Sequence, residues 1–414
     1  MRAYNGKIKI SKTKEKALRK LLALSNVFYN DMLAIALEAA DCDTILAKED
    51  LTNFEQGSRI YPDVPSDIKN KICQRVALAI SRWKFPDATG KRFGRPRFKS
   101  PDKKRMSGSF SVRDSQANAV LTTKTRRGHV VAQIHVPNFG VVKARMDDSE
   151  IQGTIKQICV KQDACGDFWV SITTDYDDCQ LLPEPQAAAG GVDLGLKHTA
   201  FAAGKTESGE VVPLDSGRGA FLQKNMSKLV NASQAKNYFG LAHIHRKIAR
   251  QRKDFNRKLA HNICLNFKTI FVGDVNAKWL FSGRLARSAA DAAHYQLKTF
   301  IAAKASKTGR KYIEVKEKYS SLVCNSCKKW NGVCSLADRD ISCPNCGASC
   351  HRDMNAALNI CEIGLGTFEF DLKSIPAKAV RDRLAKEKRR AATPQGMPAD
   401  HASEASKSPQ APSS

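Results

Sequence analysis

Four cysteines between residues 324 and 346 have the spacing of a metal site. Cys324 and Cys327 form one Cys-x-x-Cys pair, and Cys343 and Cys346 form a second in which a proline and a glycine turn the backbone. Two such pairs present four thiolates to one point, which suits tetrahedral Zn²⁺ in a closed structural site. Free or disulfide-bonded cysteines are the alternative, and the paired spacing disfavours them. Two further cysteines are interpreted as bystanders: Cys334 and Cys350.

Two aspartates lie where carboxylates are unusual. Asp193 ends an apolar strand in GVDLGLKHTAFAAG, and Asp353 begins a helix in HRDMNAALNI. An acid with apolar neighbours in a strand is costly unless it binds something, whereas an acid that begins a helix can be a simple cap. Carboxylates at the ends of separate strands and a helix can converge on divalent ions. Two hard cations about 3.5–4 Å apart, held on phosphate oxygens, need about three such groups.

The charge balance predicts a polyanionic partner. The 414 residues include 68 Lys and Arg against 41 Asp and Glu, a formal charge of +27 with a pI near 9.7. A solvated lysine surface rarely leaves such an excess, so nucleic acid is the expected partner. An acidic cluster flanked by basic surface is the layout of a phosphodiester nuclease. The length suits two or three domains.

No segment reads as a secretion signal or a membrane span. The opening MRAYNGKIKI lacks an apolar core of signal-peptide length, and no stretch approaches the length of a span. We therefore expect no membrane partner, and we interpret the 13 cysteines as thiols and zinc ligands in a reducing cytoplasm.

The first third of the chain predicts a strand, two helices and a basic loop. The strand covers residues 4–10, and the helices cover Lys14–Ala40 and Asp67–Trp83. Residues 84–105 are Gly/Pro-broken and densely basic, with three phenylalanines interleaved. Basic groups for phosphates and rings for bases are what a nucleic-acid-binding loop needs, and a solvated linker is the alternative. The basic side chains expected to contact phosphate are Arg92, Arg95, Arg97 and Lys99.

The remaining chain predicts a β region followed by an α/β region. Residues 108–174 alternate as short strands, which suits a small antiparallel barrel or sandwich completed by the N-terminal strand. A linker at 181–190 precedes the Asp193 strand. A second strand, a helical region, a strand at 268–275, a helix at 286–307, a strand at 311–319, the cysteine module and the Asp353 helix then follow. From residue 363 onward the periodic spacing of apolar residues is lost, and a basic, Pro/Ser/Ala-rich tail follows that we expect to be disordered.

These motifs carry a family resemblance. GVDLGLKHTAFAAG resembles the first RuvC motif of TnpB proteins, the transposon-encoded nucleases related to type V CRISPR effectors. HRDMNAALNI resembles their third motif, and the cysteine pairs between them resemble their inserted zinc ribbon. HRKIARQRKDFNRKLA resembles their bridging helices, and FGRPRFKS resembles the basic segment after their recognition helices. The similarity runs from about residue 4 to Ile360.

The resemblance implies an RNA-guided DNA endonuclease with a guide RNA and target DNA as partners, in which protein contacts read a short target-adjacent motif. It implies a multidomain α+β fold and Mg²⁺, two ions, in an RNase H-like RuvC domain. The host would be bacterial or archaeal and the protein nucleoid-associated. The expected parts are a wedge β-barrel at 1–10 and 106–185, a helical recognition lobe at 11–105, the RuvC domain at 190–320 and 351–362, a zinc ribbon at 321–350 and a tail at 363–414.

One departure concerns the second RuvC motif, whose strand normally ends in Glu. Here Gly273 stands at that place, followed by Asp274. Asp274 could substitute, but adjacent strand residues point to opposite faces. The chain could also be inactive, or the acid could come from the strand at 311–319. We favour Glu317 over Glu314 because it lies at the carboxyl end of that strand, where such sites sit. The predicted magnesium ligands and catalytic residues are therefore Asp193, Glu317 and Asp353.

Two functions fit these features, and a third fits them poorly. The first is the guided endonuclease, and the second is a guide-dependent DNA-binding protein without cleavage that acts as a repressor. A strand-joining transposase is the third, and it lacks a separate Tyr-His-His signature. Gln74 resembles a family glutamine that helps read the target-adjacent motif, since Gln can pair with adenine, although a surface glutamine is the plain alternative. Asp291 is interpreted as helix surface or support. The sequence predicts neither the guide RNA nor the oligomeric state.

Overall fold

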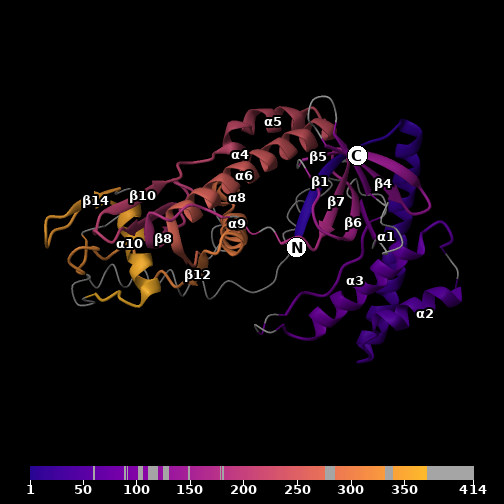
Figure 1. The fold of residues 1–414 in the computed structure, drawn as a ribbon, viewed down its shortest axis with the longest axis horizontal. Helices are drawn as coiled ribbons and strands as arrows, with labels where there is room; N and C mark the ends of the chain where they lie inside the picture. Colours follow the sequence, from indigo (N-terminus) through magenta and orange to yellow (C-terminus); the bar gives the residue numbers. More distant parts are fainter. Residues whose placement is uncertain are drawn as a thin grey trace, which may run out of the picture. The chain divides into compact units, whose positions relative to one another are not determined.

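The computed structural model describes most of the chain: residues 1–58, 61–87, 90, 92–100, 106–110, 120–124, 130–147, 150–177, 179, 181–275, 285–331 and 339–370. The tail beyond residue 370 and Cys334 lie outside these residues. The chain forms two compact units (Figure 1). Unit 1 comprises Met1–Asp178 and Asn237–Arg246, and unit 2 comprises Cys179–Lys236 and Lys247–Ser414.

Unit 1 is built on an antiparallel sheet of seven strands: β1 (Arg2–Lys9), β2 (Met106–Phe110), β3 (Val120–Lys124), β4 (Val130–Val136), β5 (Gly140–Met146), β6 (Ile155–Gln162) and β7 (Phe168–Thr174). The order is β2-β6-β7-β1-β5-β4-β3, so the N-terminal strand joins this sheet, as predicted, and it lies in the middle. The closed barrel is not observed, because the end strands β2 and β3 do not pair with each other among the described residues. Strand β2 packs instead against helices, and a Cβ at Gly108 would lie 3.1 Å from the Leu22 side chain.

Three helices lie between β1 and β2 in the chain: α1 (Lys12–Asp41), α2 (Lys48–Ser58) and α3 (Ser66–Lys84). Ser11 caps α1 by accepting a hydrogen bond from the Lys14 amide. Apolar residues at helical spacing, such as Leu18 and Phe28 of α1 and Ile68 of α3, are buried in one core with the sheet. Helix α2 was not predicted, because its apolar residues are too few to show a period.

One helix of the described residues, α1, is long and apolar enough by length and composition to cross a membrane, whereas no stretch of that kind was predicted from the sequence. More than half of its most apolar window is buried inside the protein. Its apolar side chains form the core of unit 1, which accounts for this composition.

Unit 2 contains a mixed five-stranded sheet: β8 (Ala187–Asp193), β9 (Phe201–Lys205), β10 (Val211–Asp215), β11 (Phe267–Gly273) and β12 (Lys311–Val315). Its order is β10-β9-β8-β11-β12. Strands β8, β11 and β12 are parallel, and β9 and β10 run antiparallel to their neighbours. The carboxyl ends of β8, β11 and β12 therefore meet at one edge, where ligands bind in open α/β sheets.

Helices cover both faces of this sheet. The helices described between Cys179 and the end of the described residues are α4 (Phe221–Lys224), α5 (Met226–Gln234), α6 (Tyr238–Asn266), α8 (Ala286–Ala292), α9 (His294–Lys307) and α10 (Arg352–Leu365), and the first residues of α6 belong to unit 1. A small antiparallel hairpin consists of β13 (Asp340–Ser342) and β14 (Ser349–His351). Helices α6 and α9 share a core with Val192 and Val272. Helix α10 packs on the other face, on β8 and β9, and Figure 1 shows it beside β8. It comes so close that a Cβ at Gly191 would lie 2.0 Å from the Ala357 carbonyl oxygen.

Three predicted boundaries differ in detail. The helix expected at 286–307 is broken at Ala293, whose φ of 49° ends α8 and begins α9. The strand expected at 311–319 ends at Val315, two residues before Glu317. Strand β8 begins inside the predicted linker. Its small alanines and glycines, which suggested a loop, instead form a strand on which α10 packs closely.

Candidate active site

Strand β8 ends at Asp193, and this end lies beside the end of β11 at Gly273. Val192 of β8 is the register partner of Val272 of β11, so the next residues, Asp193 and Gly273, are neighbours. Strand side chains alternate between faces. Gly191 faces α10, and a Cβ at Gly273 would lie 3.3 Å from Ile360 of α10. Asp193 and position 273 therefore share the α10 face of the sheet.

Glu317 fills the space above Gly273. A Cβ at Gly273 would lie 2.1 Å from Oε2 of Glu317 and 3.1 Å from its Cδ. The chain after β12 thus carries a carboxylate to the place where a side chain from β11 would stand. This is the geometry expected if Glu317 substitutes for the missing glutamate.

Asp193 is electrostatically coupled to the other two carboxylates. Burial, Glu317 and Asp353 together raise the pKa of Asp193 to about 8, against the opposing effect of Arg352 and Arg339. Three acids at one place repel each other, and a bound divalent cation would relieve that repulsion. The cluster is therefore suited in charge to a metal ion.

Asp353 is held at the start of α10. His351 caps this helix, and its Nδ1 accepts a hydrogen bond from the Asp353 amide at 3.3 Å. Arg339, from the segment before β13, donates from one nitrogen to both carboxylate oxygens of Asp353, at 3.0 and 3.1 Å. Arg339 was not singled out from the sequence, because it lies outside the motifs and its partner is 14 residues away.

Two alternative acids point away from this cluster. Glu314 is exposed and pairs with Lys298 of α9 at 2.9 Å, and its other oxygen accepts from Tyr312. Asp274 is also exposed, 3.9 Å from the same lysine. Both side chains therefore lie on the α9 side of the sheet, as strand alternation requires. Asp274 and Glu314 are excluded as the third acid in this conformation.

A buried histidine and aspartate support the loops around Asp193. His294 donates from Nε2 to the carbonyl of Gly195 at 2.7 Å, and burial lowers the pKa of the imidazole. Asp291 accepts from the Leu222 amide at 2.9 Å. This contact agrees with the interpretation of Asp291 as support, and the burial of its side chain shows that the alternative, a helix-surface residue, is wrong. His294 was missed because a lone histidine in a helix carries no spacing signal.

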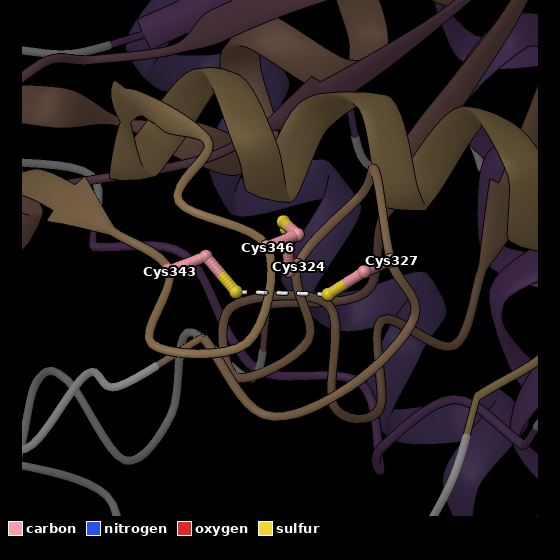
Figure 2. Close-up of side chains that lie close together, drawn as sticks. All are labelled: Cys324, Cys327, Cys343 and Cys346. Atoms are coloured by element: carbon pink, nitrogen blue, oxygen red, sulfur yellow. Dashed lines mark hydrogen bonds between the residues drawn. The ribbon is translucent and has the colours of Figure 1, made fainter.

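The four predicted cysteines converge (Figure 2). Their sulfurs lie within 4.8 Å of one another, with 3.9 Å between Cys324 and Cys346 and 3.6 Å between Cys327 and Cys343. Although burial opposes ionisation, the backbone amides of Asn345 and Cys346 help to lower the pKa of Cys343 to about 6. This is the arrangement that a tetrahedral thiolate metal site requires. Cys350 is half-buried nearby and is not one of the four.

Buried asparagines join the cysteine module to α10. The Asn325 amide donates to Oδ1 of Asn355 at 2.8 Å, and Asn355 donates back to the Val323 carbonyl at 2.7 Å. One turn later, Asn359 donates to the carbonyls of Ser320 and Val323 and accepts from Asn325. The asparagines of the HRDMNAALNI motif therefore fix the helix that carries Asp353 to the module that carries the cysteines.

A histidine cluster adjoins Asp353. Ligand atoms of His198, His351 and Asp353 lie within 4.8 Å of one another. His198 is oriented through Nδ1 by Asp215 at 2.7 Å, and the ring of His351 stacks on Phe201. This group lies beside the predicted site and shares one of its carboxylates.

The predicted nucleic-acid-binding residues have different surroundings. Gln74 is exposed on α3, and its Oε1 accepts from Lys71 at 3.0 Å. Arg92 and Arg97 are exposed. Arg95 pairs with Asp41 at 2.8 Å, and Lys99 is half-buried. The interleaved rings of Phe85, Phe93 and Phe98 are all about half exposed.

Comparison with known proteins identifies relatives of the chain. Residues 294–360 match the family model described as Cas12f1-like, TNB domain, a range that includes Glu317, the four cysteines and Asp353. A protein of Streptomyces pristinaespiralis named "Putative RNA-guided DNA endonuclease" is 27% identical over 296 residues, covering 70% of each chain. TnpB-like protein L79 of Acanthamoeba polyphaga mimivirus is 29% identical over 133 residues, covering 30% of this chain and 25% of that protein.

The chain is similar to TnpB-like proteins and to a protein named as an RNA-guided DNA endonuclease. The fold agrees. A chain in the solved structure of a Cas12f1-sgRNA-target DNA complex superimposes with a TM-score of 0.57 at 14% sequence identity, covering 85% of this chain and 83% of that one. At that identity the likeness shows the fold alone, a mixed fold of helices and sheets.

Proposed function

We propose that the chain is an RNA-guided DNA endonuclease that hydrolyses phosphodiester bonds at Asp193, Glu317 and Asp353. The observation that carries the proposal is the placement of Glu317 over Gly273, beside Asp193 and on the face of α10. It supplies a third carboxylate where the second RuvC motif lacks one. Unit 2 would then be the RuvC domain and the four-cysteine module its zinc ribbon.

The three carboxylates fit divalent metal ions. Their mutual repulsion, expressed in the raised pKa of Asp193, is what hard cations such as Mg²⁺ neutralise. Bound ions of this kind, two in our proposal, lower the pKa of water and stabilise charge on phosphate oxygens. Asp193, Glu317 and Asp353 would hold them, and α10 and β8 would keep two of these ligands in place.

Arg339 has a complementary role in this proposal. Its guanidinium lies on Asp353 and would have to share or release that carboxylate when metal binds. A guanidinium beside the reacting phosphate also binds its oxygens through several donors. Arg339 therefore links the segment before the cysteine pair Cys343/Cys346 to the carboxylate cluster.

Zn²⁺ is the ion that we propose for Cys324, Cys327, Cys343 and Cys346. Four thiolates with no further ligand leave no open position for chemistry, so the role would be structural. This structural role would also affect catalysis, because Asn325 and Asn355 join the cysteine module to the helix that carries Asp353. Without the ion, Asn325 and the backbone at Val323 would no longer hold α10, and Asp353 would lose its fixed position.

Guide RNA and target DNA are the proposed partners. The formal charge of +27 and the exposed aromatic and basic groups of residues 82–99 favour a nucleic acid on unit 1. We propose Gln74 for reading the target-adjacent motif and Arg92, Arg95, Arg97 and Lys99 for phosphate contacts. The names of the relatives are consistent with a guided mechanism.

A reconstitution experiment tests the function. The protein is purified with the RNA that co-purifies from cells carrying its natural locus, and the guide segment is reprogrammed against a plasmid library with randomised flanks. We expect Mg²⁺-dependent cleavage that follows the guide and selects one flanking motif. Guide-dependent binding without cut plasmid would favour the repressor-like alternative, and a complex with neither property would contradict the proposal.

A further inference from the structure

Two cations of unit 1 converge on a single aromatic ring. Nζ of Lys99 lies 3.7 Å from the centre of the Tyr29 ring, and the guanidinium carbon of Arg75 lies 5.8 Å from the same centre. Tyr29 belongs to α1, Arg75 to α3, and Lys99 to the basic segment that follows α3. Three separate parts of the chain thus build one positively charged place.

Lys99 is fixed in this place by its backbone. The Asn30 side chain accepts from the Lys99 amide at 2.7 Å and donates to the Lys99 carbonyl at 2.6 Å. Asn30 follows Tyr29 on α1, so the residue that anchors Lys99 adjoins the ring that its ammonium covers. The backbone of Lys99 is therefore held against α1, at a place from which its ammonium reaches the Tyr29 ring.

Within the part of the chain that the structure describes, the two cations lack the acidic partner that their neighbours have. Arg95, which also lies over an aromatic ring, pairs with Asp41 at 2.8 Å, and Lys20 of α1 pairs with Asp63 at 3.3 Å. Within the described residues, no carboxylate forms an ion pair with Lys99 or Arg75. Burial and Arg75 lower the pKa of Lys99 to about 8, with Cys159 of β6 acting in the opposite direction. The charged form is costly here unless an anion joins it.

We propose that Lys99 and Arg75, packed on Tyr29, form a binding site for a backbone phosphodiester of a nucleic acid. Arginine can donate to two phosphate oxygens while lysine supplies a compact charge, and one phosphate supplies the missing negative group. The site deepens the proposed function, on which it rests. Because Arg75 follows Gln74 on α3, the phosphate would be held next to the residue proposed to read a base. Contacts of this kind set position rather than sequence preference.

The test compares charge-removing variants with a matched control. Lys99→Met and Arg75→Gln are measured beside Lys20→Met, which removes an exposed, acid-paired lysine from the same unit. Affinity is measured at several salt concentrations for guide RNA, and then for duplex target DNA with the protein–RNA complex. We expect each site variant to reduce the salt slope by about 0.7–0.9 in one arm, which identifies the nucleic acid that supplies the phosphate. Lys20→Met should leave both slopes unchanged.

Lys99→Arg keeps the charge and should retain most of the slope, which separates loss of a phosphate contact from a folding defect. Thermal melting of each variant checks the fold. If Lys99→Met and Arg75→Gln behave like Lys20→Met in both arms while the wild type binds normally, the site is wrong and the proposed function stands. If the wild type binds neither nucleic acid, both proposals are contradicted.

Discussion

The carboxylate of Glu317 occupies the position that a side chain on Gly273 would take, with 2.1 Å between its Oε2 and an ideal Cβ there. The missing side chain of Gly273 on β11 therefore leaves the space that the carboxylate of Glu317, after β12, fills. The relationship predicts that Gly273 cannot carry a side chain while Glu317 holds its place.

Gly273→Ala should displace Glu317. The added methyl overlaps a carboxylate oxygen, so we expect about 1–3 kcal/mol of lost stability and a loss of cleavage of roughly 10–100-fold. Denaturant midpoints and guided cleavage rates measure the two effects. Gly209→Ala adds a methyl where a Cβ meets nothing within 4 Å, and although its positive φ costs some stability it should leave cleavage unchanged. Normal cleavage by Gly273→Ala would show that Glu317 need not stay where it lies.

Moving the acid should preserve the site. In the double variant Gly273→Glu with Glu317→Ala, the carboxylate comes from β11 and the side chain that blocked it is gone. We expect the double variant to cleave faster than Glu317→Ala alone, since the new acid faces α10 next to Asp193. Guided cleavage rates of the wild type, the single variant and the double variant give the comparison. Equal rates for Glu317→Ala and the double variant would count against the shared position.

The zinc module should act on the site through α10. Cys343→Ser removes one of four clustered thiols, and Cys350→Ser removes a neighbouring thiol outside the cluster. We expect Cys343→Ser to lose its zinc, melt at a lower temperature and cleave slowly, because Asn355 and Asp353 depend on the module. Metal analysis of the purified proteins and guided cleavage are the readouts. A Cys343→Ser protein that keeps about one zinc per chain would rule out this ligand set.

In the absence of added divalent cations, the folding stability of the protein should decrease as the pH rises. The pKa of Asp193 is about 8 in the folded protein against an ordinary value of 3.8, so the folded state binds more protons than the unfolded state in between. The group therefore favours folding at low pH and loses that contribution as pH rises through about 8. Melting temperatures at pH 5.5 and 8.5 should differ more for the wild type than for Asp193→Asn, and added Mg²⁺ should raise the pH 8.5 value. The same pH dependence in both proteins would contradict the coupling.

Much of this arrangement was predictable because the signals are local. The cysteine spacing, the two aspartates and the amphipathic helices α1 and α3 depend on residues close together in the chain. Glu317 was predicted from the resemblance to TnpB proteins, whose second RuvC motif ends in Glu where this chain has Gly273, and from its place at the carboxyl end of the expected strand. The alternation that turns Glu314 and Asp274 toward Lys298 follows from the strand period alone.

Contacts between distant segments were not predictable in the same way. Arg339 reaches Asp353 only because a hairpin folds back, and His294 braces Gly195 from 99 residues away. Among the described residues β2 and β3 do not pair, and β2 packs on helices, which are contacts that no single strand encodes. The break at Ala293 comes from a positive φ at an alanine, a residue type that favours helix.

The most direct test of the account is guided plasmid cleavage by Glu317→Gln, with Glu314→Gln as the matched control. Both variants remove one negative charge from the same segment, but Glu314 is held by Lys298 on the other side of the sheet. We predict that Glu317→Gln binds guide RNA and target DNA normally and cleaves more slowly by a factor beyond the roughly 10–100-fold cost of losing an outer-shell partner. Glu314→Gln should cleave at nearly the wild-type rate. Cleavage by Glu317→Gln at the wild-type rate would contradict the assignment of this carboxylate to the active site.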